Sequence, residues 1–156
     1  MMNVEITLST PELFVGASVG NMRRIASMQN GNNKNKHAHK SDWATDADGA
    51  CAEMAASKYY GIYWEPHVNV FHERPDLSNG YNVRSTCHAS GRLIIRPNDS
   101  EDHLFILVIC KAPTFRLVGA IVGKVGKQVD FFQKGDFGEG DAWWVPQDWL
   151  AELPDK

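Results

Sequence analysis

The chain has few cysteines, no long apolar run and little net charge, and each shortage excludes a class of protein. Its three cysteines, Cys51, Cys87 and Cys110, are too widely spaced for the paired cysteines of a zinc or redox site. The longest apolar stretch, residues 104–110, is far too short to cross a bilayer, and residues 1–6 lack the basic and apolar regions of a signal peptide. We therefore expect a cytoplasmic protein without a membrane partner, whose cysteines are reduced core residues.

The net charge of -3 hides two regions of opposite sign. Residues 23–42 carry five Lys or Arg against one Asp, a local charge of +4, whereas residues 130–156 carry seven Asp or Glu against two Lys, a local charge of -5. A basic segment on a near-neutral body favours approach of a polyanion from one side. Ordinary solvated surface is the simpler explanation of both regions, and from charge alone we prefer it.

Start and stop signals predict two helices. An N-cap, a first-turn proline and an acidic residue at Thr10-Pro11-Glu12 begin a helix that runs to about Gln29, and a second helix is capped at residue 45 or 46 and ends near Tyr60. Residues 30–42 between them are rich in Asn and Lys and almost free of apolar side chains. They cannot bury enough surface to order themselves, so we expect a mobile basic loop within one domain over residues 1–156.

After the second helix the pattern becomes extended. The β-rich runs are residues 62–64, 68–71, 81–86, 93–96, 104–110 and 115–122. They predict an α/β (α+β) domain with a mixed sheet of about five strands, flanked by the helices, in which the most apolar run, 104–110, is central. Ser90-Gly91 favours a hairpin, and residues 143–146 are typical of an edge strand or docked segment.

Glu53 lies on a face of the second helix that is made of small residues, with Ala50 three positions before it and Ser57 four positions after it. Such a face can lie close to a sheet. A carboxylate buried there must pair with a cation or serve a metal or substrate, because an unpaired buried carboxylate costs several kcal/mol. A partly exposed helix glutamate fits the pattern equally well.

A second polar group follows in the sequence. Asp76 lies in a turn, six residues before Asn82 and eight before Arg84, and the latter two side chains share one face of a strand. If the chain folds Asp76 back beside them, a carboxylate, an amide and a guanidinium converge. Such a group can hold a divalent cation through oxygen ligands and place a positive charge beside a phosphate.

At these residues the sequence resembles the PD-(D/E)XK nuclease superfamily, and within it a group of small, often phage-borne proteins. The resemblance covers residues 23–150 and rests on residues 49–55, 58–64, 75–76, 83–86, 93–96 and 145–146. It implies a restriction-endonuclease-like core in which a helix Glu, a turn Asp and a strand Glu-x-Lys surround Mg²⁺ or Mn²⁺. The implied activity is hydrolysis of phosphodiester bonds, here in DNA, by a metal-activated water.

By this resemblance Glu53 and Asp76 are metal ligands, and Asn82 and Arg84 occupy the Glu-x-Lys positions. All four are then the catalytic candidates, with Asn82 as the third metal ligand. Asn82 offers a neutral oxygen where a carboxylate is expected, and Arg84 does not readily exchange a proton. Two functions therefore stay open: a Mg²⁺-dependent nuclease, and a catalytically silent module of the same fold that binds nucleic acid or inhibits a host protein.

The DNA-binding candidates are basic or imidazole side chains of the first helix and the loop after it. They are Arg23, Arg24, Lys34, Lys36, His37, His39 and Lys40. If the acidic C-terminal region is the contact surface instead, a protein partner is the better hypothesis, either a host protein or a second copy of this chain.

Overall fold

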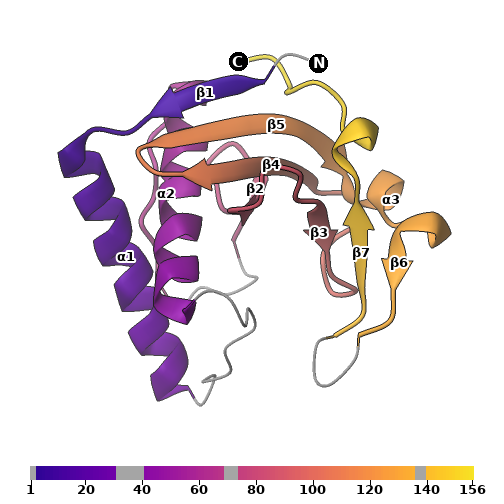
Figure 1. The fold of residues 1–156 in the computed structure, drawn as a ribbon, viewed down its shortest axis with the longest axis horizontal. Coiled ribbons are helices and arrows are strands. Elements are labelled where there is room, and N and C mark those ends of the chain that lie inside the picture. Colours follow the sequence, from indigo (N-terminus) through magenta and orange to yellow (C-terminus); the bar gives the residue numbers. More distant parts are fainter. Residues whose placement is uncertain (1–2, 31–40, 69–73, 136–139) are drawn as a thin grey trace.

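Two long helices come early in the chain, and most of the strands follow them (Figure 1). The computed structural model describes residues 3–30, 41–68, 74–135 and 140–156. The helical elements are α1 (Thr10–Gln29), α2 (Asp42–Tyr60), α3 (Gly123–Gly126), η1 (Val129–Phe131) and η2 (Gln147–Trp149); the strands are β1 (Val4–Thr7), β2 (Asn82–Thr86), β3 (Leu93–Ile95), β4 (Leu104–Lys111), β5 (Thr114–Val122), β6 (Phe132–Gln133) and β7 (Ala142–Val145). The mixed α and β composition expected from the sequence is confirmed. Within the described ranges, no helix has the length and apolar character needed to span a membrane.

Local capping chemistry sets the helix boundaries. Ser9, not Thr10, is the N-cap of α1, and it forms a capping box in which its hydroxyl accepts from the Glu12 N–H while Glu12 accepts from the Ser9 N–H. Ser41 caps α2, four residues before residue 45, the earlier of the two predicted caps. It ends at Gly61, whose φ of 65° is the left-handed conformation that favours glycine.

The larger sheet has four strands in the order β1-β5-β4-β2, and only the β2–β4 pair is parallel. The prediction that residues 104–110 form a central strand is confirmed, since β4 lies between β5 and β2. Because β2 pairs with β4 alone, it forms one edge of this sheet.

A second, smaller sheet has the order β3-β7-β6, and three predictions fail there. The strands do not form one sheet of about five; Ser90-Gly91 does not join a hairpin, because β2 pairs with β4 while β3 pairs with β7. The segment around Trp143 is the middle strand, not an edge. Each failure concerns which strand pairs with which, a long-range choice that alternation within one strand does not specify. Residues 62–64 form no strand, and the run 68–71 lies mostly outside the described residues.

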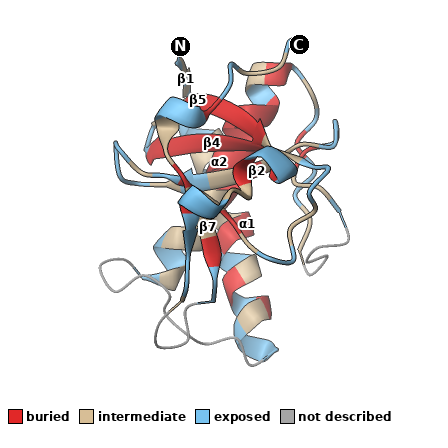
Figure 2. Ribbon diagram, turned by 90° about the vertical axis from the view of Figure 1, so that its right-hand side faces the viewer, coloured by how far each residue is buried: buried red, intermediate tan, exposed pale blue. Residues whose placement is uncertain are grey.

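The two faces of β4 build two hydrophobic clusters. Ile106 and Val108 pack in the cluster formed with α2, whereas Phe105 and Leu107 pack in the cluster that includes Val145 of β7. Figure 2 shows β4 and β5 buried along most of their length, as expected for strands covered on both faces. The two long helices, α1 and α2, lie toward one end of the four-stranded sheet, whereas the small sheet and α3 lie toward the other (Figure 1).

Candidate functional site

Glu53 is buried, and an arginine from the neighbouring helix binds both of its oxygens. Arg23 Nη1 lies 2.7 Å from Glu53 Oε2, and Arg23 Nη2 lies 3.0 Å from Oε1. The Trp64 indole donates to Glu53 Oε1 at 3.4 Å, and Arg23 Nε donates to the His67 carbonyl at 3.1 Å. The small-residue face of α2 thus brings a carboxylate inside, as predicted, and the carboxylate pairs there with a cation.

Burial and charge act in opposite directions on this pair. Burial raises the pKa of Glu53, and the nearby charge of Asp76 adds to the rise, while the hydrogen bonds from Arg23 oppose it. Burial alone would lower the pKa of Arg23, but the hydrogen bonds and charge of Glu53 outweigh it and raise that pKa. The bidentate geometry is the strongest form of arginine–carboxylate contact, so we assign the pair as an ionic one.

Asp76 lies near Glu53 but is anchored to β2. Its Oδ2 accepts the Val83 N–H at 2.8 Å, and its charge contributes to the pKa values of both Glu53 and Arg23. The structure therefore brings two of the four candidate residues, Glu53 and Asp76, within electrostatic reach of each other.

The other two candidates lie on the opposite face of the sheet. Val83 packs in the cluster formed with α2, so its neighbours Asn82 and Arg84 point the other way, sharing a face as alternation predicts. Asn82 Nδ2 lies 3.2 Å from Nδ1 of His103, and Arg84 lies over the Phe105 ring. The expected convergence of all four residues is wrong, because Glu53 lies with Arg23 on the α2 side of β2, whereas Asn82 and Arg84 point to the opposite face. Asp76 lies at the edge of β2, bound to the backbone N–H of Val83.

The residues present do not fit the Mg²⁺ site that the resemblance implies. Both oxygens of Glu53 are bound by Arg23, one oxygen of Asp76 is bound by a backbone N–H, and Asn82 contacts His103 on the far face. In the part of the chain that the structure describes, no three His, Cys, Asp or Glu side chains form a group that could hold a metal.

Two of the predicted nucleic-acid-binding residues, Arg23 and Arg24 of α1, already bind carboxylates of α2. Arg23 is held by Glu53, and Arg24 is buried, with its Nη1 lying 3.2 Å from Asp42 and 3.6 Å from Asp46. Both residues tie α1 to α2 and leave no free guanidinium for a phosphate. The remaining candidates Lys34, Lys36, His37, His39 and Lys40 lie outside the described residues.

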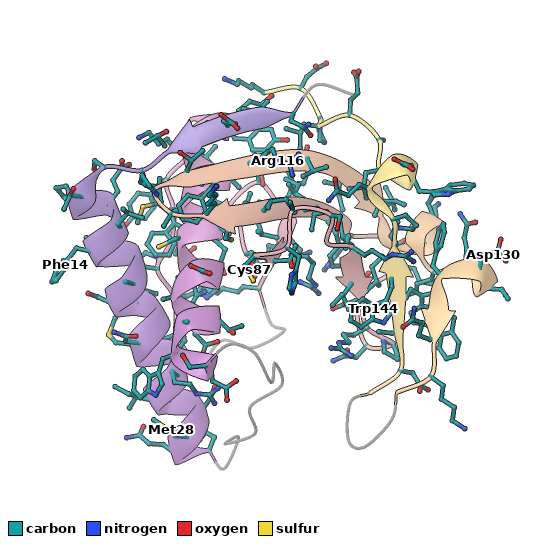
Figure 3. The ribbon with its side chains drawn as sticks, in the orientation of Figure 1. Phe14, Met28, Cys87, Arg116, Asp130 and Trp144 are labelled. Carbon is teal, nitrogen blue, oxygen red and sulfur yellow. The ribbon has the colours of Figure 1, made fainter. Side chains whose placement is uncertain are left out.

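A pocket lies beyond the edge strand β2, between the first half of α2 and the small sheet. It has a volume of about 250 Å³ and is lined by Thr45, Asp48, Arg84, Ser85, Thr86, Cys87, His88, Gly91, Arg92, Ile94, Cys110 and Trp144. Figure 3 shows Cys87 in the space between α2 and the small sheet, and Trp144 on β7. The sequence did not predict this pocket, because its wall residues come from separate elements. Only the positions of Arg84 and of the tryptophan pair indicated it.

Arg84 is the most firmly fixed polar side chain of the pocket. Its Nε donates to the Ile94 carbonyl at 3.2 Å, its Nη1 to the Val83 carbonyl at 3.4 Å, and its Nη2 lies 2.8 Å from Asp99 Oδ1. The Asp99 side chain is only 6% exposed. These contacts hold the guanidinium in one orientation at the pocket wall.

No family model, curated protein or solved structure matches the chain. Two features of the chain itself bear on function: an internal ion pair between α1 and α2, and a pocket with arginines beyond β2.

The three cysteines differ in reactivity. Burial, with the charge of Asp48, raises the pKa of Cys51 to about 11, and Cys110 is buried too, but Cys87 is exposed. The prediction that all three are core residues is therefore wrong for Cys87.

We expect one thiol to react rapidly with Ellman's reagent in the native protein at neutral pH, and the other two only after unfolding. A Cys87→Ser variant should show no rapid phase; two rapid thiols in the wild type would contradict the assignment.

Proposed function

We propose that the chain is a nucleic-acid-binding protein of the PD-(D/E)XK type, with DNA as the first ligand to test, that does not cut what it binds. The observation that carries the proposal is the joint placement of Arg84, Arg92 and Trp144 at one pocket. Guanidinium groups bind phosphate through paired N–H donors, and tryptophan offers a flat surface to a base. Proteins that bind single nucleic-acid strands combine cationic side chains with aromatic rings.

The Glu53–Arg23 pair supports the proposal that the protein binds nucleic acid without cutting it. Both Glu53 oxygens accept from the same guanidinium, and its positive charge opposes a metal ion at the same carboxylate. Separating a buried pair of this kind costs about 3–5 kcal/mol. Glu53 and Arg23 are accordingly a structural tie between α1 and α2.

One observation favours a second candidate, a Mg²⁺-dependent nuclease centred on Glu53 and Asp76. Burial raises the pKa of Glu53 most, and the charge of Asp76 adds to the rise, so the two carboxylates lie within electrostatic reach of each other. Carboxylate oxygens are the donors that hard cations prefer. The two candidates differ in a simple way, since only the second one degrades DNA.

Binding is tested by fluorescence anisotropy with short labelled DNA, using Arg92→Gln and a matched control. We expect affinity to fall steeply between about 50 and 200 mM salt, because released counterions drive phosphate binding. Arg92 is exposed and lines the pocket, so its loss should weaken binding and reduce the salt slope by about 1. Arg74 is also exposed but pairs with Glu65, so Arg74→Gln should bind as the wild type does.

Cleavage is tested by incubating plasmid and single-stranded DNA with the protein and Mg²⁺ or Mn²⁺. We expect both substrates to stay intact. Degradation that disappears in folded Glu53→Gln and Asp76→Asn variants would instead establish the nuclease. Absence of binding to any nucleic acid would overturn the proposal and leave a protein partner as the better hypothesis.

A further inference from the structure

The pocket beyond β2 is small and has an apolar wall beside its arginines. We propose that it takes one unpaired nucleotide, with the base against Trp144 and Ile94 and the phosphate at Arg84 and Arg92. This inference rests on the proposed nucleic-acid binding and adds to it a preference for single strands. Its volume of about 250 Å³ lies below the range of about 300–1,000 Å³ for pockets that enclose larger ligands. A base inside a duplex is stacked and paired and cannot enter such a space.

The strand register supplies the flat wall for a base. Ile94 of β3 pairs directly with Trp144 of β7, so the two side chains lie side by side on one face of the small sheet. The adjacent Trp143 points the other way, where it packs against Phe132 and lies near the Lys127 ammonium. Of the two consecutive tryptophans, only Trp144 therefore lines the pocket.

The arginines lie beside that wall. Among the described residues, the contacts of Arg84 use three of the five N–H groups of its guanidinium, which leaves two that can donate to a phosphate. Arg92 Nη1 lies 3.5 Å from the Trp144 carbonyl, so the second guanidinium stays close to the strand that carries the tryptophan. A base on Trp144 would thus have its own phosphate within the reach of two cations.

Hydrogen bonds among its own residues fix the rim of the pocket. The Gln147 amide donates to the Ala89 and Gly91 carbonyls at 2.9 and 3.0 Å. Arg116 Nη2 also donates to the Ala89 carbonyl, at 3.0 Å. A Cβ at Gly91 would lie 2.4 Å from Thr86 Cγ2 and 3.0 Å from the His88 carbonyl oxygen, so a larger residue there would force this turn to shift. A rim that is fixed in advance lowers the entropic cost of binding.

The first test compares a short labelled single strand with its duplex, and the same single strand with one carrying abasic sites, all on the wild-type protein. We expect the single strand to bind at least about tenfold more tightly than the duplex. The abasic strand should bind more weakly than the intact single strand by a similar factor, because stacking of one base contributes affinity on that scale. Equal, salt-sensitive binding of all three would overturn the inference and leave the proposed nucleic-acid binding intact. No binding of any of them would overturn both.

A second test changes the protein. Trp144→Leu should lose about tenfold or more in single-strand affinity, while duplex affinity stays the same. Trp149 is 57% exposed on η2 and packs against Phe131 away from the pocket, so Trp149→Leu is the matched control and should keep the preference. Thermal unfolding of both variants shows that they are folded. An unchanged single-strand affinity in folded Trp144→Leu would overturn the role assigned to Trp144.

Discussion

The Glu53→Ala variant is expected to lose about 3–5 kcal/mol of unfolding free energy, because it leaves the Arg23 guanidinium without its carboxylate in a mostly buried place. The Arg23 side chain is 20% exposed and that of Glu53 is 9% exposed, so water replaces little of what is lost. Urea unfolding at neutral pH, followed by circular dichroism, measures the change. Arg23→Met combined with Glu53→Met should be less destabilised than Glu53→Ala, since no buried charge is left unpaired.

An exposed pair of the same length is the control. Arg74 Nη1 lies 2.7 Å from Glu65 Oε1, the same distance as in the Arg23–Glu53 pair, but both side chains are about half exposed. Removal of Glu65 should therefore change stability by less than about 1 kcal/mol. Equal losses for Glu53→Ala and Glu65→Ala would mean that burial does not strengthen the Arg23–Glu53 contact, and the structural role of Glu53 would have to be abandoned.

The features that could be predicted from the sequence are those that nearby residues decide. The extent of α1 follows from a serine cap and an acidic third residue, and the end of α2 follows from Gly61. Likewise, Asn82 and Arg84 do share a face, because side-chain alternation is a property of the strand itself.

The features that could not be predicted are those that distant residues decide. The face on which Arg84 lies depends on the parallel pairing of β2 with β4, which sets Val83 opposite Ile106 and turns its neighbours away from α2. The charge partner of Glu53 comes from α1, thirty residues earlier, and that of Arg84 comes from Asp99 in a turn. The predicted site therefore joined Glu53 with Asn82 and Arg84, which the structure places on opposite faces of β2.

The Gly20→Ala variant is expected to lower the unfolding free energy by about 2 kcal/mol or more, although alanine is the better helix former. A Cβ at Gly20 would lie 2.5 Å from Ala47 Cα and 2.6 Å from the Ala47 nitrogen and the Asp46 carbonyl. These are backbone atoms of α2, so the clash is relieved only if the two helices move apart. Thermal and urea unfolding of the purified variant measure the loss.

Gly49→Ala is the matched control, because Gly49 is also inside a long helix but has open space around it. The nearest atom to its added Cβ is Ser85 Oγ at 3.9 Å, so the variant should gain about 0.5–1 kcal/mol from reduced backbone freedom. Equal changes in the two variants would contradict the close approach of α1 and α2 at Gly20. Since Arg23 follows Gly20 by one turn, helices pushed apart at Gly20 should also weaken the Arg23–Glu53 pair, and Glu53→Ala should then cost less in the Gly20→Ala background than in the wild type.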